Sequence, residues 1–381
     1  MSEAVYFLFS PQPWNSQQSR TRAFAIELSR MGCRTIYVNP PSSLAGIVRE
    51  SVSAAVYPLR RENIPFKYNS DMLEVWSPPI LPTFYRGSLT PGLDRRLFKA
   101  WFDKRVTRIR NPIVAIVAMP YWWDGFLNDH RENFSAIVFD YQDPISTYAR
   151  SEKIHRHMTE VFTELVSNVS GIITHTDANY QKLLGYRKSS DISIIRNGGN
   201  AGPSRRHIDL EKIKRPEHPV IGTVGRISQN IDTDLLLELA DNFPEGVVVN
   251  IGTVSRYARS LKAKKNIHLV PAVSDIVFHS KISTFDVGIL PYHRNIEGSP
   301  LRVYDLLSEY LQIISTDFPD VQYFKDVVHI AGNHNEFVSI TRDILYDKSR
   351  WIHEDVIEAF LQNNTWKQRA RDLIAFCKRL L

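Results

Sequence analysis

The chain has 381 residues, of which 43% are apolar and 23% charged, and a formal net charge of +6. This composition excludes extensive disorder, and the length exceeds what one hydrophobic core usually organises, which predicts two domains. The two cysteines, Cys33 and Cys377, have no metal-ligand spacing and indicate thiols of a reducing compartment. No apolar run approaches the roughly 20 residues of a membrane helix, and Ala4–Phe9 is too short for a signal segment, so we expect a cytoplasmic protein.

Positive charge is concentrated in the first 110 residues, which hold sixteen Lys and Arg against eight Asp and Glu. The rest of the chain is slightly acidic. Such a field favours an anionic partner: a phospholipid, a lipid-linked diphosphate or nucleic acid.

Short β-branched runs alternate with helix-patterned stretches, the pattern of βαβ units and parallel sheets. In the first half the predicted strands are Val5–Phe9, Arg34–Val38, Leu73–Trp76, Ile113–Ala118, Ala136–Asp140, Gly171–His175 and Ile192–Arg196. In the second half they are Val220–Val224, Val247–Ile251, Ile267–Val270, Val287–Leu290, Gln312–Ser315 and Val327–Ile330. The predicted helices include Ser19–Met31, His155–Val169, Thr233–Asn242 and a final helix from about Trp351 to Leu381.

The two sets of strands are separated by a segment rich in Gly, Pro, Asn and charge, which has the composition of a linker. We therefore predict one α/β domain over residues 1–200, a linker over 201–218 and a second α/β domain over 219–355. Both are expected to be doubly wound and Rossmann-like. Ligands of such sheets bind beyond the carboxyl ends of the strands.

Two glycines mark the end of the strand Val220–Val224, in the sequence Gly222-Thr-Val-Gly225-Arg226. Glycines at a strand end let backbone N–H groups approach a phosphate, and Arg226 can neutralise a diphosphate. A tight turn followed by a solvated arginine has the same pattern.

A richer pattern follows the strand Val287–Leu290: Pro291 and Tyr292, then Glu297-Gly-Ser-Pro-Leu-Arg302-Val-Tyr-Asp305. The proline at position 300 favours a helix start, which places Asp305 in the helix and Glu297 in the loop before it. Carboxylates suit the vicinal hydroxyls of a ribose or sugar, Arg302 suits a diphosphate, and the helix N-terminus attracts anions. The alternative is a buried helix cap with surface charges.

The stretches 285–292, 300–307 and 313–316 resemble the donor-site segment of GT-B glycosyltransferases, most closely the GT4-like bacterial enzymes of teichuronic-acid and exopolysaccharide assembly. Those enzymes carry a P-[LM]-K-x-x-E-Y-L-A-x-G-x-P-V-V-S pattern. The resemblance implies two facing Rossmann-like domains, with the nucleotide-sugar donor on the second. It implies donor contacts at Gly225, Arg226, Pro291, Tyr292, Ser299, Arg302, Val303 and Asp305, and identifies Glu297 with the first carboxylate of the E-x7-E pair of retaining members.

The chain departs from that pattern at three positions. Arg302 replaces the lysine, Asp305 replaces the glutamate, and Tyr310 stands where the family has glycine. The basic residue common after the glycine turn is replaced by Ser-Gln-Asn at 228–230. Neutralisation of the diphosphate is therefore assigned to Arg226 and Arg302.

The segment Val138–Tyr148, after a first-domain strand, contains Asp140 and Asp143 and is similar to a segment of the xanthan glucuronosyltransferase. The aspartate of that enzyme is the general base of an inverting reaction, and Asp143 matches it. A carboxylate beside an acceptor hydroxyl can take its proton. The alternative is that Asp140 caps the next helix and Asp143 belongs to an Asp-Pro turn. The two resemblances imply opposite stereochemistry, which stays open.

Further acceptor-side candidates follow the first and fourth strands. Trp14 and Arg20 lie in a polar loop. Trp122 and Asp124 lie in an aromatic segment where a ring could stack on a sugar, although core packing explains the pair Trp122 and Trp123 equally well. The stretch 365–371 resembles the closing helix of the family, which implies that a helix over 356–381 returns to the first domain.

The segment Arg95–Arg110 sets Leu97, Trp101 and Phe102 among cations at helical spacing. Such a helix can lie on an anionic membrane, or it can cover the sheet with its cations solvated, and both can hold together.

The function that these patterns favour is sugar transfer from a UDP- or GDP-sugar to a lipid-linked or polysaccharide acceptor in bacterial surface polysaccharide synthesis, at the inner face of the plasma membrane. No cofactor is expected, and the absence of a D-x-D motif predicts metal independence. The alternatives are an epimerase or inactive scaffold of the same fold, or a basic module that binds membrane or nucleic acid. The last lacks the motifs of nucleic-acid binders, so no nucleic acid is expected as a partner.

Overall fold

The computed structural model describes residues 4–15, 19–40, 71–78, 91–145, 151–200, 218–253, 255–273, 275–296 and 298–381. Glu297 and nearly all of the predicted linker at 201–218 lie outside them. The chain divides into two compact units, Met1–Arg196 with Arg369–Leu381, and Asn197–Gln368. Each unit contains one parallel sheet.

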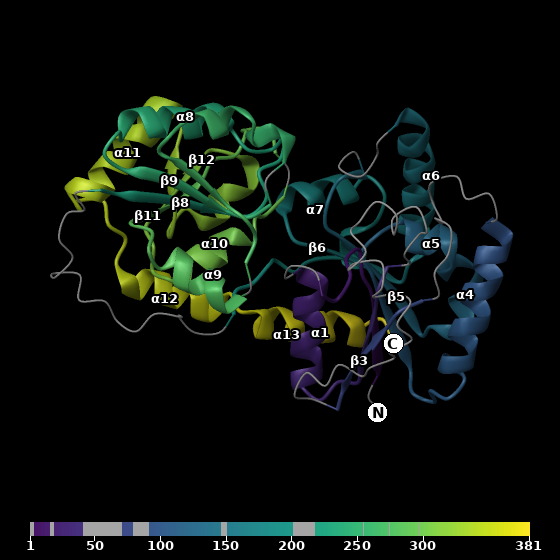
Figure 1. Ribbon diagram of the computed structural model, residues 1–381. Helices are drawn as coiled ribbons and strands as arrows, with labels where there is room; N and C mark the ends of the chain where they lie inside the picture. The colour runs from purple at the N-terminus through teal and green to yellow at the C-terminus, as the bar shows by residue number, and fades with distance from the viewer. Residues whose placement is uncertain are drawn as a thin grey trace. The chain divides into compact units, whose positions relative to one another are not determined.

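The first unit is built on a seven-stranded sheet of order β3-β2-β1-β4-β5-β6-β7. Its strands are β1 (Val5–Phe9), β2 (Thr35–Val38), β3 (Leu73–Trp76), β4 (Ile113–Val117), β5 (Ala136–Tyr141), β6 (Gly171–Thr174) and β7 (Ile192–Ile194). Its helices are α1 (Arg20–Arg30), α4 (Pro91–Val106), α5 (Tyr121–Gly125), α6 (Glu152–Asn168), α7 (Asp177–Leu183) and most of α13 (Trp366–Lys378). Helices α1 and α13 lie on one side of the sheet, and α4, α5 and α6 on the other (Figure 1).

Helix α4 is the predicted basic helix, and its inner face belongs to an aromatic core. Phe98 and Phe102 are fully buried, with ring centroids 4.2 and 4.7 Å from that of Phe126. The sheet-covering interpretation is therefore confirmed, and Phe102 has no access to a membrane, contrary to the membrane-surface interpretation. Leu97 is 45% exposed. The described part of the helix also carries three exposed cations, Arg96, Lys99 and Lys104, and the exposed Arg108 follows its end.

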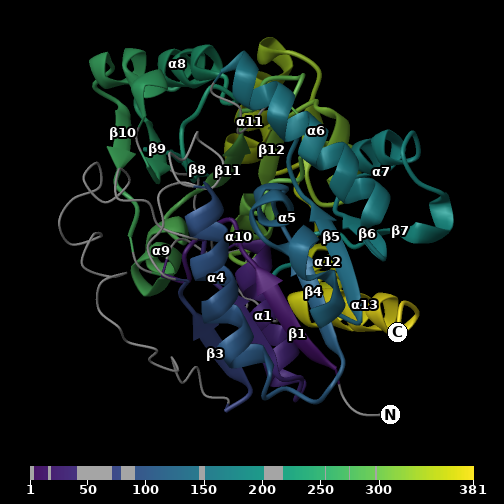
Figure 2. The ribbon, with the colours of Figure 1, turned by 90° about the vertical axis from the view of Figure 1, so that its right-hand side faces the viewer.

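The second unit has a six-stranded sheet of order β10-β9-β8-β11-β12-β13. Its strands are β8 (Val220–Val224), β9 (Val247–Ile251), β10 (Ile267–Val270), β11 (Val287–Leu290), β12 (Ile313–Thr316) and β13 (His329–Ala331). Its helices are α8 (Thr233–Asn242), α9 (Asp275–Ile282), α10 (Arg302–Leu307), α11 (His334–Tyr346), α12 (Glu354–Asn363) and the first turn of α13. Helices α8 and α11 cover one face, and α9, α10 and α12 the other (Figures 1 and 2).

The strand order of the second unit reverses between β8 and β11. The chain adds β9 and β10 on one side of β8 and then returns to place β11 on the other, with Val287 in register with Ile221. The carboxyl ends of β8 and β11 are therefore neighbours. In doubly wound sheets such a switch point is where ligands bind.

The predicted final helix is two helices. Helix α12 ends at Asn363, and α13 begins at Trp366 after a break at Asn364 and Thr365. The Thr365 side chain accepts a hydrogen bond from the Gln368 N–H (3.1 Å), and the threonine also bridges to Gly199. A side chain that bonds a helix N–H favours a new helix start over continuation of the old one.

Candidate functional site

Three residues from separate parts of the second unit meet at the switch point: Gly225 after β8, Tyr292 after β11, and Arg302 at the start of α10. The Arg302 guanidinium lies over the Tyr292 ring, with Cζ 5.0 Å from its centroid. Gly225 has φ +97°, and a Cβ there would lie 2.6 Å from Arg302 Nη2. The glycine is therefore required by its backbone conformation and by the close approach of the guanidinium.

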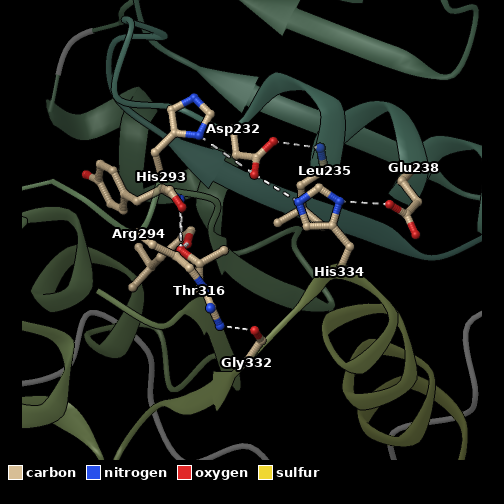
Figure 3. Close-up of polar contacts among 10 residues, drawn as sticks. Asp232, Leu235, Glu238, His293, Arg294, Thr316, Gly332 and His334 are labelled. Atoms are coloured by element: carbon tan, nitrogen blue, oxygen red, sulfur yellow. Dashed lines mark hydrogen bonds and ion pairs between the residues drawn. The ribbon is translucent and has the colours of Figure 1, made fainter. Parts of the chain in front are cut away.

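The two loops that carry Gly225 and Tyr292 are joined by backbone hydrogen bonds. Ile231 and Tyr292 form an isolated antiparallel bridge, the Asp232 N–H donates to the Pro291 carbonyl (2.8 Å), and the His293 N–H donates to the Asn230 carbonyl (3.0 Å). Thr316 Oγ1, at the end of β12, donates to the Tyr292 carbonyl (2.6 Å) (Figure 3). The predicted donor residues Pro291 and Tyr292 are thus held in place by the loop after β8 on one side and by the end of β12 on the other.

Two arginines give this site its charge. Arg226 is exposed and Arg302 half-buried, and neither pairs with a carboxylate within the described part of the chain. Burial raises the pKa of the Tyr292 hydroxyl against the opposing effect of Arg302, so the tyrosine is a neutral platform. Two guanidiniums beside a glycine turn suit a diphosphate, because guanidinium groups bind phosphate oxygens in pairs.

The remaining predicted donor residues lie around α10. Asp305 is half-buried in its first turn, and the Ser299 carbonyl accepts a hydrogen bond from Asn197 Nδ2 (2.8 Å). The side chain of Val303 is fully buried in the core, and the predicted donor contact of this residue stays a prediction. Helix α10 has only six residues. Its dipole is correspondingly small, so the arginines carry most of the charge available to neutralise the phosphates, and the contribution of the helix N-terminus stays a prediction.

Gly222, the first glycine of the predicted phosphate turn, has another role. A Cβ at this position would lie 1.9 Å from the Phe285 ring. The ring packs directly on the β8 backbone, and Gly222 is therefore a packing glycine. Only Gly225 belongs to the turn at the strand end.

In the first unit, Arg20 and Asp140 form a buried ion pair. Arg20 Nε lies 3.0 Å from both Asp140 carboxylate oxygens, and Gln142 Nε2 donates to Oδ2 (2.9 Å). Their side chains are 3% and 1% exposed. Both predictions for Asp140 are thereby wrong: it does not cap the next helix, whose N-cap is Ser151, and neither it nor Arg20 presents a charge to an acceptor.

His175, at the end of β6, belongs to the same buried cluster. Burial, together with the positive charge of Arg20, lowers the pKa of its imidazole to about 3. The ring is therefore neutral at physiological pH. Burial also raises the pKa of the Asp140 carboxyl, while Arg20 and Gln142 act in the opposite direction.

Asp143 lies just beyond this cluster and is half-buried. Its role as general base stays a prediction. Asp124, the other half-buried acidic candidate of this unit, lies 3.1 Å from His157 Nε2 on α6.

The two predicted acceptor-side tryptophans are buried. Trp122 is 1% exposed, and its indole N–H donates to the Ser10 carbonyl (3.0 Å). Trp14 is 3% exposed and lies between Tyr37 and Arg22. Of the two interpretations of Trp122, core packing is the correct one, because a ring that stacks on a sugar needs an open face.

Some residues of the site were not predicted. Tyr304 Oη donates to the Asn197 carbonyl (2.8 Å), which anchors α10 to the Asn-Gly-Gly turn. Asp232 and His334 flank the interlocked loops. The only local signal for them was Asp232 as a helix N-cap, whose side chain accepts from the Leu235 N–H (3.0 Å).

Within the described residues no helix could cross a membrane, and no three His, Cys, Asp or Glu side chains group in a way that could hold a metal ion. The predicted metal independence stays a prediction.

Two doubly wound parallel sheets, with a C-terminal helix that returns to the first unit, define the GT-B fold. No family model and no curated protein sequence matches the chain. Solved structures do. The sucrose-phosphate synthase of Thermosynechococcus elongatus has a TM-score of 0.74 at 11% identity and covers 99% of both chains. HepE of Anabaena, solved with UDP, has a TM-score of 0.66 at 11% identity over the full length of both chains.

A putative UDP-N-acetylglucosamine 2-epimerase of Listeria monocytogenes shares the fold at a TM-score of 0.51 and 9% identity, covering 98% of this chain and 96% of that one. At such identities the likeness concerns the fold alone. The predicted GT-B fold is confirmed, and the activity must be argued from the residues of the site.

Proposed function

We propose that this protein is a glycosyltransferase that takes a sugar from a UDP- or GDP-sugar. The observation that carries the proposal is the meeting of Gly225, Tyr292 and Arg302 at the switch point of the second sheet. A glycine turn, an aromatic platform and a guanidinium without a carboxylate partner among the described residues suit a diphosphate. The UDP held by HepE in its solved structure supports this assignment.

Arg302 and Arg226 would bind the diphosphate and stabilise the charge that grows on it as it leaves. In this reaction the bond between the anomeric carbon and the diphosphate oxygen breaks, and the acceptor oxygen bonds to that carbon. The nucleoside diphosphate departs with the electron pair. Cations already in place where that charge develops lower the barrier, because they need no reorganisation during the reaction.

Two carboxylates complete the proposed donor site. Asp305 follows Arg302 by one helical turn and would accept hydrogen bonds from ribose hydroxyls. Glu297, outside the described residues, remains a candidate for contact with the sugar through the resemblance alone.

Asp143 is the proposed base that takes the proton of the acceptor hydroxyl. Asp140 is unsuited to this role, because Arg20 and Gln142 occupy its oxygens. Asp143 is half-buried, so its carboxyl is less enclosed than that of Asp140.

The acceptor is proposed to be a lipid-linked or growing bacterial surface polysaccharide. The exposed cations of α4 support this, since they would draw the protein to an anionic membrane surface. Only Leu97 is an exposed large apolar residue on the described part of that helix, so the attraction would be mainly electrostatic and sensitive to salt.

An epimerase is the second candidate, because the epimerase from Listeria shares the fold. The two activities are separated by their products: a transferase releases nucleoside diphosphate, whereas an epimerase that leaves the nucleotide-sugar intact does not.

The test has two steps. A thermal-shift screen with UDP- and GDP-sugars should raise the unfolding temperature for at least one donor. Release of nucleoside diphosphate from that donor, with membrane-derived acceptor, should then fall about 100-fold or more in Asp143→Asn. Its unfolding temperature and donor affinity should remain those of the wild type. If no donor shifts the transition, the assignment is wrong; if Asp143→Asn retains full turnover, Asp143 is not the base.

A further inference from the structure

The first residue of α11, His334, lies between the carboxylate of Asp232, the N-cap residue of α8, and that of Glu238 within α8. Its Nε2 lies 2.9 Å from Asp232 Oδ2, and its Nδ1 lies 2.9 Å from Glu238 Oε2 (Figure 3). His293, from the segment after β11, approaches the same Asp232 oxygen at 3.9 Å. Two further charged groups lie nearby: Glu336 on α11 accepts from the Gly332 N–H, and Arg294 donates to the Gly332 carbonyl.

The hydrogen-bonding pattern requires the charged form of this histidine. A neutral imidazole has one N–H, so one of the two carboxylates would face a lone pair, whereas an imidazolium donates to both. Burial opposes a charge on His334, but hydrogen bonds and attraction from Asp232 and Glu238 outweigh it and raise the pKa of the ring. The side chain is 35% exposed, so the ring can exchange protons with solvent.

Asp232 connects this ion cluster to the switch-point site. One carboxylate oxygen caps α8 through the Leu235 N–H, and the other faces His334. Its backbone N–H donates to the Pro291 carbonyl, and the preceding residue bridges to Tyr292. A change in the position of Asp232 therefore acts on the platform that lies beneath Arg302.

We propose that His334 is a positioning residue for the donor site: its imidazolium clamps α11 to α8 through Asp232 and Glu238, and so holds Pro291 and Tyr292 in place under Arg302. The identity of the ligand rests on the proposed function. The clamp is complete when His334 is protonated. It is present below about pH 6.5, the ordinary pKa of histidine, and is lost as the pH rises through the raised pKa of the folded protein.

Calorimetric titration with UDP, and in parallel with GDP, tests this between pH 5.5 and 9 on the wild type and His334→Gln. For each nucleotide, the dissociation constant of His334→Gln is divided by that of the wild type at the same pH. This ratio cancels the effect of the titration of the nucleotide itself. We expect the wild type to bind the nucleotide about threefold more tightly than His334→Gln at pH 6, which is the scale of a partly exposed ion pair. At pH 9 the two proteins should bind it equally.

Two further variants sharpen the test. Asp232→Asn retains an N-cap side chain but removes the charge that faces His334. Like His334→Gln, it should bind nucleotide more weakly than the wild type at pH 6 and equally at pH 9. His268→Gln, at an exposed position of β10 in the same unit, should follow the wild type at every pH.

A ratio that does not change with pH would overturn the clamp, as would a His334→Gln protein that unfolds earlier but binds nucleotide as the wild type does. Absence of binding by the wild type at every pH contradicts the proposed function instead. The unfolding of the same proteins in urea then decides the clamp. A wild-type advantage that disappears at high pH supports it, and equal stability throughout overturns it.

Discussion

Substitution of Gly225 by alanine tests the switch-point site where its geometry is tightest. The new Cβ would lie 2.6 Å from Arg302 Nη2 and 3.0 Å from Cζ, closer than non-bonded atoms tolerate. Because the guanidinium ends a flexible chain, Arg302 moves and the backbone stays. Loss of its charge-assisted hydrogen bonds to a diphosphate costs about 1.5–3 kcal/mol, which is roughly a 10- to 100-fold weaker affinity for UDP or GDP.

The same substitution also strains the backbone, because Gly225 has φ +97°. That strain lowers stability by about 1–2 kcal/mol. Gly32→Ala, in the other unit, is the matched control: Gly32 has φ +82°, and a Cβ there would meet nothing within 4 Å. Both variants should unfold earlier in urea, and only Gly225→Ala should lose affinity in calorimetry. Equal nucleotide affinity of the two variants would refute the placement of the diphosphate beside Arg302.

Three further predictions concern the first unit. Asp140→Asn removes the carboxylate charge that faces the buried Arg20 and should cost about 3–5 kcal/mol, seen as an earlier urea midpoint; an unchanged midpoint would contradict the ion pair. His175, with a pKa of about 3, contributes stability that is present above pH 6.5 and lost as the pH falls towards 3, so unfolding curves of His175→Gln should be less sensitive to acid over that range. Burial raises the pKa of the Cys377 thiol to about 12, so a thiol reagent should modify the half-exposed Cys33 first and Cys377 only at the rate of unfolding; equal rates would contradict this burial.

The strands were predictable because parallel strands buried on both faces read as short, nearly continuous β-branched runs. Val5–Phe9, Val220–Val224 and Val287–Leu290 have the predicted bounds, and the other strands agree to within about two residues at each end. The break between α12 and α13 was missed, because the hydrogen bond that the Thr365 side chain accepts from the Gln368 N–H outweighs a continuous helical pattern.

The side-chain network was not predictable. Arg20 and Asp140 are 120 residues apart, and each alone has the pattern of an exposed functional charge. Their pairing depends on the lateral order of β5 and the N-terminus of α1, which no local pattern specifies. The same holds for His334 and Asp232, 102 residues apart.

Tyr310, which replaces a glycine of the resembled pattern, adopts a left-handed backbone conformation. Its φ of +53° lies in the region that glycine favours. The turn between α10 and β12 therefore has the conformation expected for a glycine, at the cost of strain in a non-glycine residue.

The most direct test of the proposed donor site is calorimetry of the wild type and Arg302→Ala with UDP, UMP, GDP and GMP. A diphosphate site predicts that one diphosphate binds at least about tenfold more tightly than its monophosphate, and that Arg302→Ala removes the difference. Equal affinity for diphosphate and monophosphate, or an undiminished preference in Arg302→Ala, would contradict a donor site at the ends of β8 and β11.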